Sequence, residues 1–158
     1  MVPRRSMPEV SGSDETLKRQ GPPNHSRRSP IPVPLGRDDV AEMLSLATAA
    51  QPGPFETRTV EFGGYLGIRI GGRLVAMAGE RLRPPGYVEI SAVATDPGFR
   101  RLGLARQLVA AVADGIIQGG ATPFLHVLAR NTAAVRIYQS LGFTIRRPAP
   151  FVVFEAPG

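Results

Sequence analysis

Three arginines and a glycine lie where a strand-like run of the sequence gives way to a helix-like one. The run YVEISAVAT is followed by FRRLGLAR and then by the apolar, helically spaced QLVAAVADGII. The first N–H groups of a helix lack partners within the helix, so they attract anions. Gly103 has no Cβ and lets a phosphate approach the backbone, while Arg100, Arg101 and Arg106 supply positive charge. The junction therefore predicts a phosphate-binding site.

The two commonest nucleotide motifs do not account for this junction. Gly98 and Gly103 have the spacing of a P-loop, but Leu104 and Ala105 stand where that motif requires Lys and Ser/Thr. The dinucleotide motif G-x-G-x-x-G is absent here, and no βαβ unit opens it. Both nucleotide interpretations therefore fail, and a different phosphate-containing ligand is expected.

A longer pattern around the junction resembles the GNAT superfamily of N-acetyltransferases. The form R-x-x-G-x-A, from Arg100 to Ala105, is similar to that family's pyrophosphate loop, and SAVATDPGFRRLGLARQLV is similar to its acetyl-CoA motif. NTAAVRIYQSLGF is similar to its next motif, with Asn131 and Tyr138 at the marked positions. Arg101 departs from the family, which very often has glycine there, but the looser motif admits any residue.

The resemblance runs from about Val33 to Phe154 and implies acetyl-CoA as the acyl donor. It also implies that the backbone of the strand before the loop holds the pantetheine arm. An N–H near Val93 would then stabilise the oxyanion, a contribution of about 3 kcal/mol per donor in other enzymes. The cofactor-binding residues that it implies are Val93, Ala94, Thr95, Arg100, Arg101, Leu102, Gly103, Leu104, Ala105, Arg106, Asn131 and Tyr138.

Glu89 is the candidate general base, acting through a water. Regular alternation along the strand places it on the same face as Ser91, Val93 and Thr95, and histone-type members of the superfamily carry their glutamate base at a similar offset. The alternative is a carboxylate in a hydrogen-bond network at the sheet edge. His126 is a second base candidate, although a core histidine bonded to the backbone is the favoured interpretation.

Tyr138 is the candidate general acid. It lies seven residues after Asn131, two helical turns along one face. Its reference pKa of about 10 lies above the roughly 8.5 of a thiol, so the phenol holds its proton at neutral pH and can protonate the departing thiolate. The alternative is an aromatic ring packed on the sheet. Asn131 occupies an N-cap position, which is compatible with a contact to the cofactor.

The elements that must position these residues follow from hydrophobic periodicity and turn signals. The order is strand, helix, three strands, helix, strand, helix and two strands. This predicts a mixed α/β fold with a mostly antiparallel sheet of six to seven strands flanked by three to four helices. The strands are expected at 31–35, 65–70, 73–83, 87–95, 123–129, 143–147 and 151–155, and the helices at 40–50, from 104 to Gly119 and at 131–141.

Composition favours one globular domain. Residues 1–30 are rich in Pro and Ser and hold six Lys/Arg against three Asp/Glu, which predicts a disordered basic tail before an acetyltransferase domain at 31–158. The chain has no cysteine, so disulfides, thiolate metal sites and a cysteine nucleophile are excluded, and no metal is expected. Short apolar runs and the absence of a signal pattern predict a cytoplasmic protein that does not contact a membrane.

Three functions from different classes are compatible with these patterns. The favoured one is transfer of an acetyl group from acetyl-CoA to a primary amine of a small molecule or peptide. The second is a non-catalytic module that holds acyl-CoA as a sensor. The third is a nucleic-acid arm in the tail, but this segment lacks interleaved aromatics and a reader fold, so no specific nucleic acid is expected. A monomer and a homodimer are both compatible with the sequence.

Overall fold

The computed structural model describes residues 29–50, 61 and 64–148, and its elements follow the predicted order. Five strands form the sheet of this part of the chain. The strands are β1 (Val33–Leu35), β2 (Tyr65–Ile70), β3 (Arg73–Glu80), β4 (Tyr87–Thr95) and β5 (Thr122–Phe124), and the helices are α1 (Val40–Ala50), α2 (Leu104–Gln118) and α3 (Thr132–Ser140), with short 3-10 turns η1 (Arg37–Asp39) and η3 (Pro97–Phe99).

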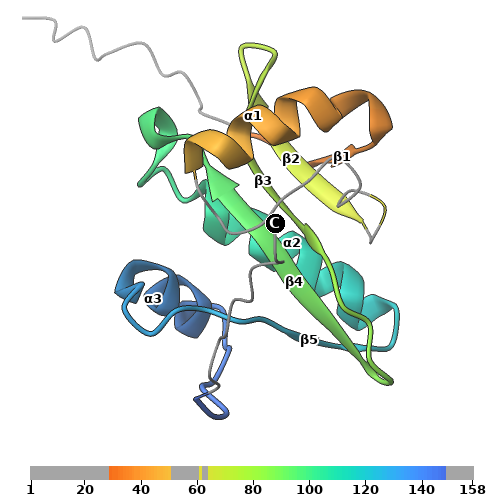
Figure 1. Ribbon diagram of the computed structural model, residues 1–158. Helices are drawn as coiled ribbons and strands as arrows, with labels where there is room; N and C mark the ends of the chain where they lie inside the picture. The colour runs from red at the N-terminus through yellow and green to blue at the C-terminus, as the bar shows by residue number, and fades with distance from the viewer. Residues whose placement is uncertain (1–28, 51–60, 62–63, 149–158) are drawn as a thin grey trace, which may run out of the picture.

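The sheet is mixed, as the sequence predicts. Its strand order is β1-β2-β3-β4-β5, in which the first four strands are antiparallel to their neighbours and β5 is parallel to β4. A parallel neighbour requires a crossover connection, which α2 supplies. Figure 1 shows α1 and α2 on opposite faces of the sheet, with α3 next to the diverging ends of β4 and β5. The fold class predicted from the sequence is confirmed.

Each face of the sheet carries its own hydrophobic cluster. The α2 stripe of Leu104, Leu108, Val112 and Ile116, predicted from its spacing, is buried against β2, β3 and β4. On the other face, α1 contributes a second cluster, which contains Leu35, Met43, Leu46, Ala47, Tyr65, Leu74, Met77 and Ala94. The two layers of side chains hold the sheet rigidly between the helices, so the ends of β4 and β5 have fixed positions.

The hairpin between β2 and β3 turns at Gly71 and Gly72, as predicted. Both glycines have positive φ, +59° and +81°, as the two central residues of a type I′ hairpin turn require. At the other end of the sheet, the alternating prolines of IPVPL leave only Val33–Leu35 paired, on the edge next to β2.

A β-bulge interrupts β4 at Ala92. Met77 of β3 pairs with Ala94, and Gly79 pairs with Ser91, so β4 has one extra residue between these pairs. Ala92 has φ +50°, in the left-handed region that side chains rarely occupy. The extra residue breaks the alternation of side chains along the strand.

The bulge corrects one sequence prediction. Ala92 and Ala94 pack toward the α1 cluster, whereas Val93 packs toward the α2 cluster. Glu89 lies between Val88 and Ile90, which both point to the α2 face, so its side chain points to the α1 face. The prediction that Glu89 shares a face with Val93 and Thr95 is therefore wrong, because it assumed an uninterrupted strand.

The strands β4 and β5 pair only where they begin. Thr122, Pro123 and Phe124 lie opposite Tyr87, Val88 and Glu89, and β4 then continues to Thr95 beside β3 while the chain after β5 turns away. Figure 1 shows this divergence, with α3 beyond it. Bulges increase local twist, which accounts for a parting of the strands next to Ala92. Within the described residues, the edge of β4 after Glu89 therefore has no strand partner on the β5 side.

Two predicted strands at the C-terminal end are not found where expected. The strand at 123–129 is shorter than predicted and covers 122–124. Residues 143–147 form no strand, since the Phe143 N–H bonds to the Tyr138 carbonyl at the end of α3. The strand predicted at 151–155 lies outside the described residues, as does nearly all of the predicted tail. The described sheet therefore has fewer strands than the six to seven predicted.

Gly79 lies directly beneath the ring of Tyr65. A Cβ built on Gly79 would come within 2.4 Å of two ring carbons, and Tyr65 is fully buried. We predict that Gly79→Ala lowers the free energy of unfolding by about 1–3 kcal/mol, because the core has no room for the methyl group. Urea denaturation measures this. Gly36→Ala is the control, since its Cβ would meet nothing within 4 Å, and its change should stay within about 0.5 kcal/mol.

Candidate active site

The strand-to-helix junction has the geometry of an anion site. Asp96 accepts a hydrogen bond from the Gly98 N–H (2.8 Å) and starts the turn η3. Gly103, with φ +77°, is the N-cap of α2 and provides no side-chain cap. The first helical bond runs from Gln107 N–H to the Gly103 carbonyl, so the N–H groups before Gln107 have no acceptor within the helix. Open space lies where a Gly103 Cβ would be.

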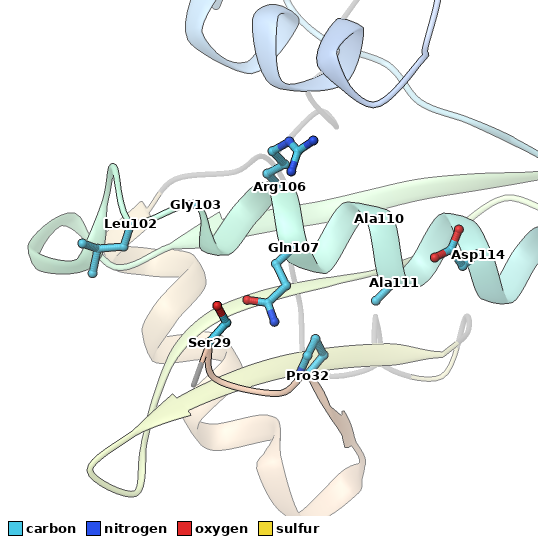
Figure 2. A pocket seen from close by; sticks show the side chains of 9 residues that line it. All are labelled: Ser29, Pro32, Leu102, Gly103, Arg106, Gln107, Ala110, Ala111 and Asp114. Atoms are coloured by element: carbon cyan, nitrogen blue, oxygen red, sulfur yellow. The ribbon is translucent and has the colours of Figure 1, made fainter. Parts of the chain in front are cut away.

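Positively charged side chains surround this helix start. Arg100, Arg101 and Arg106 are exposed, and Leu102 between them is 57% exposed. Arg106 points toward α3 and places its Nε 3.4 Å from the Ser140 Oγ, so it bridges the two helices (Figure 2). The arginine positions therefore agree with the charge that the sequence predicts at the junction.

On the other side of α2, Gln107 forms a hydrogen bond with the segment that precedes β1. Its Nε2 donates to the Pro30 carbonyl at 2.6 Å, and Figure 2 shows the hollow between this segment and the helix. This hollow reaches Gly103 but contains neither Glu89 nor Tyr138. The structure thus separates it from the proposed catalytic residues.

Arg101 has a strained backbone. Its φ of +62° lies in the left-handed region, which costs a side-chain-bearing residue about 1–2 kcal/mol and glycine almost nothing. We predict that Arg101→Gly is more stable than Arg101→Ala by about 1 kcal/mol, because both variants lose the charge and only glycine relieves the backbone. Thermal or urea unfolding of the two variants measures the difference, and an alanine variant as stable as the glycine one contradicts the prediction.

A buried carboxylate ties the loop to the distant β2–β3 hairpin. Asp96 is 9% exposed, and Arg73 at the start of β3 donates to its Oδ2. The Arg73 guanidinium also lies 5.9 Å from the centre of the Phe99 ring. Arg73 therefore fixes both ends of η3 and, through it, the position of the helix start. The sequence analysis missed this residue, because the contact spans 23 positions.

The predicted pantetheine-binding residues lie on the free part of β4. Ala94 and Thr95 pair with Met77 and Ala76 of β3, which leaves the opposite edge of the strand facing the gap toward β5. Val93 lies beside the bulge on the α2 face. Within the described residues, the buried Oγ1 of Thr95 has no hydrogen-bond partner. Among the described residues, no strand pairs with this edge of β4 from Val93 to Thr95, which is the condition for an extended ligand to bind a strand through its backbone.

Glu89 is buried and held by two basic side chains. Arg81 donates to both of its oxygens, from Nε at 2.9 Å and from a terminal nitrogen at 2.7 Å, and Nδ1 of His126 lies 2.8 Å from Oε1. Burial works to raise the pKa of Glu89, but the hydrogen bonds from Arg81 and His126 outweigh it and hold that pKa below its usual value. Glu89 is thus ionised at neutral pH, in the kind of network the sequence analysis gave as its alternative.

His126 is not the core histidine that the sequence favoured. Its side chain is 58% exposed, and its partner is the Glu89 carboxylate instead of a backbone group. It follows β5, where the chain leaves β4, and its ring meets the Phe124 ring edge-on at 5.7 Å. Phe124 in turn meets Tyr87 edge-on at 6.3 Å. The imidazole therefore has a fixed orientation at the mouth of the gap.

Tyr138 and Asn131 lie on α3 at the far side of the gap. The Asn131 Oδ1 accepts a hydrogen bond from the Ala134 N–H at 3.2 Å, which confirms the predicted N-cap. Tyr138 is half-buried against the α2 cluster and meets Phe143 edge-on. Burial raises the pKa of the Tyr138 phenol above its usual value, so the group is protonated at neutral pH. The packing role and the acid role are compatible.

Sequence comparison gives one family match and several relatives. The profile of the FR47-like protein family matches residues 65–152. An N-alpha-acetyltransferase RimI from Mycobacterium tuberculosis is 38% identical over 82 residues, which is 50% of this chain and 51% of that protein. The chain therefore spans about half the length of this curated relative.

Comparison with solved structures gives the same fold. A protein of the GNAT family from Novosphingobium aromaticivorans is 47% identical with a TM-score of 0.71, over 73% of this chain and 52% of that one. The ribosomal-protein-S18-alanine N-acetyltransferase of Escherichia coli is 26% identical with a TM-score of 0.65, over 74% of this chain and 79% of that one. In the part of the chain that the structure describes, no helix is long and apolar enough to cross a membrane.

Proposed function

Because the chain belongs to the FR47-like family, within the GNAT superfamily of acetyltransferases, we propose that it transfers an acetyl group from acetyl-CoA to a primary amine. One observation carries the proposal, namely the open start of α2 at Gly103 with three arginines around it. Backbone N–H groups at a helix start, together with guanidinium groups, suit a diphosphate. The residues present thus fit the donor that the family uses.

The donor's two ends would occupy different parts of the site. Its diphosphate would meet the N–H groups of Leu104 and Ala105, and its extended arm would run along the free edge of β4 from Thr95 toward Val93. An N–H at the bulge would then polarise the thioester carbonyl. The donor supplies the activated acyl group, and the chain's residues orient it.

Tyr138 is the proposed general acid. It belongs to α3, which lies next to the diverging ends of β4 and β5 (Figure 1), and it keeps its proton, so it could deliver that proton to the departing sulfur. Its position on α3, next to the α2 cluster, keeps the ring from rotating freely. The Glu89 side chain points to the α1 face, and we expect the acceptor to enter from that side.

The proposed acceptor is the α-amino group at the N-terminus of a protein or peptide. The relative from Mycobacterium tuberculosis is named for N-alpha acetylation, and the Escherichia coli structure for the alanine of a ribosomal protein. Aminoglycoside acetyltransferases are also structural neighbours, but at 18% identity they inform the fold alone. The named activities of the closer relatives favour an enzyme over a non-catalytic acyl-CoA sensor.

Thiol release from acetyl-CoA tests this function. Peptides with a free N-terminus should release CoA, whereas the same peptides with an acetylated N-terminus and a free lysine should not. Aminoglycosides and polyamines complete the panel. Calorimetry with CoA tests the donor site separately. Heat of CoA binding without thiol release from any amine would support the sensor, and the absence of both would contradict the proposal.

A further inference from the structure

The side chains Arg81, Glu89 and His126 form a connected cluster at the mouth of the gap between β4 and β5. Arg81 follows β3, Glu89 is in β4 and His126 follows β5, so three segments of the chain contribute one group each. Only His126 among them is mostly exposed, at 58%, while the Glu89 side chain is 2% exposed. The cluster therefore presents an imidazole to the gap and keeps the carboxylate behind it.

The hydrogen bonds decide which nitrogen of His126 is available. Glu89 is ionised and can only accept, so the Nδ1 at 2.8 Å must carry a proton and donate it. In the neutral ring, this leaves a lone pair on Nε2, the nitrogen away from Glu89. Arg81 occupies both Glu89 oxygens and prevents the carboxylate from taking the proton itself. A carboxylate that orients a histidine in this way leaves Nε2 free to accept a proton.

We infer that His126 is the general base that deprotonates the acceptor amine and that Glu89 is a positioning residue for its ring. The inference rests on the proposed acetyl transfer. The amine nitrogen forms a C–N bond to the thioester carbon, and the C–S bond breaks. The amine proton goes to Nε2 of His126, and the departing sulfur takes the Tyr138 proton. Solvent then returns both groups to their starting states.

The aromatic row next to His126 supports this assignment. Tyr87 and Phe124 meet edge-on, and Phe124 meets His126, so the ring is packed from one side and held by Glu89 from another. Within the described residues, Glu89 and Arg81 are the charged groups of the cluster, and Tyr65 interacts with Arg81 from β2. Burial raises the pKa of Tyr65 to about 12, so it adds no charge at neutral pH.

His126→Asn is the direct test. Asparagine keeps a donor for Glu89 but has no base, so kcat in thiol release should fall about 100-fold at neutral pH, the usual size of a general-base contribution. The acid limb of the pH–rate profile should disappear. His126→Ala should regain activity when imidazole is added. Calorimetry with CoA and urea denaturation should match the wild type. His25→Asn, which removes the chain's other histidine, is the control.

Glu89→Gln distinguishes the positioning role of Glu89 from the base role of His126. As a positioning group, Glu89 can be replaced by an amide at a partial cost in kcat, and the acid limb should remain. If Glu89→Gln abolishes turnover and removes the limb while His126→Asn stays within threefold of wild type, Glu89 is the base and the inference is wrong. Wild-type protein that binds CoA but releases no thiol with any amine contradicts the proposed function, and the inference with it.

Discussion

Tyr138→Phe is expected to lower kcat at least 100-fold while leaving the affinity for CoA and the stability almost unchanged. The hydroxyl is the only group removed, and general acid catalysis contributes about 10²–10⁴-fold. The ring remains packed against the α2 cluster and edge-on to Phe143. Steady-state thiol release with saturating acetyl-CoA measures the effect, and calorimetry with CoA verifies that the donor site is intact.

The pH dependence of the wild type follows from the same residue. Burial raises the pKa of Tyr138, so its acid form persists to higher pH than that of a free phenol, which titrates at about 10. In the proposed role the acid form is the active one, so the ratio of wild-type to Tyr138→Phe rates should stay constant between about pH 7 and 9. Tyr87→Phe serves as the matched control, with its exposed ring. A purely structural Tyr138 would leave turnover within threefold.

Glu89→Gln should also destabilise the protein, by about 3 kcal/mol at pH 7. Removing one partner of a buried ion pair leaves the other without compensation, and the partial exposure of Arg81 and His126 places the effect at the lower end of the usual range. Urea denaturation measures this loss. A double-mutant cycle with Arg81→Gln measures the interaction between Arg81 and Glu89. The double variant should lose less free energy of unfolding than the two single variants lose together.

The sign of the pH effect distinguishes charge from packing. The pKa of Glu89 is lowered in the folded protein, so its ionisation stabilises the fold above the unfolded-state pKa of about 4.3. That stability is lost as pH falls through the folded-state pKa. The difference in free energy of unfolding between wild type and Glu89→Gln should therefore be largest at pH 7 and become smaller at acidic pH. An unchanged difference at pH 3 would attribute the loss to packing instead.

Local patterns in the sequence predict most of the framework. The helix spacing of Leu104, Leu108, Val112 and Ile116 and the glycines of the β2–β3 hairpin depend on neighbouring residues, and the structure confirms both. The N-cap of Asn131 is equally local. These features are predictable because the pattern that signals each of them, a helical spacing or a turn or cap residue, lies within a few positions of the chain.

The sequence predictions that were wrong concern features that depend on contacts between residues far apart in the chain. The pairing of His126 with Glu89 spans 37 positions and requires the parallel register of β5 on β4. A lone histidine in an apolar run carries no sign of that register, so the core interpretation was wrong. The bulge at Ala92 is invisible for a different reason: alanine is not a residue that prefers φ +50°, and the surrounding packing imposes it.

The single extra residue in β4 also constrains how this protein can change during evolution. Upstream of Ala92 the Glu89 side chain points to the α1 face of the sheet, and downstream of the bulge the alternation of side chains between the two faces is reversed. A deletion of one residue here would exchange inside and outside for every following position up to Thr95, and an insertion upstream would do the same to Glu89. Substitutions can accumulate in this strand, but we do not expect it to tolerate the insertion or deletion of a single residue.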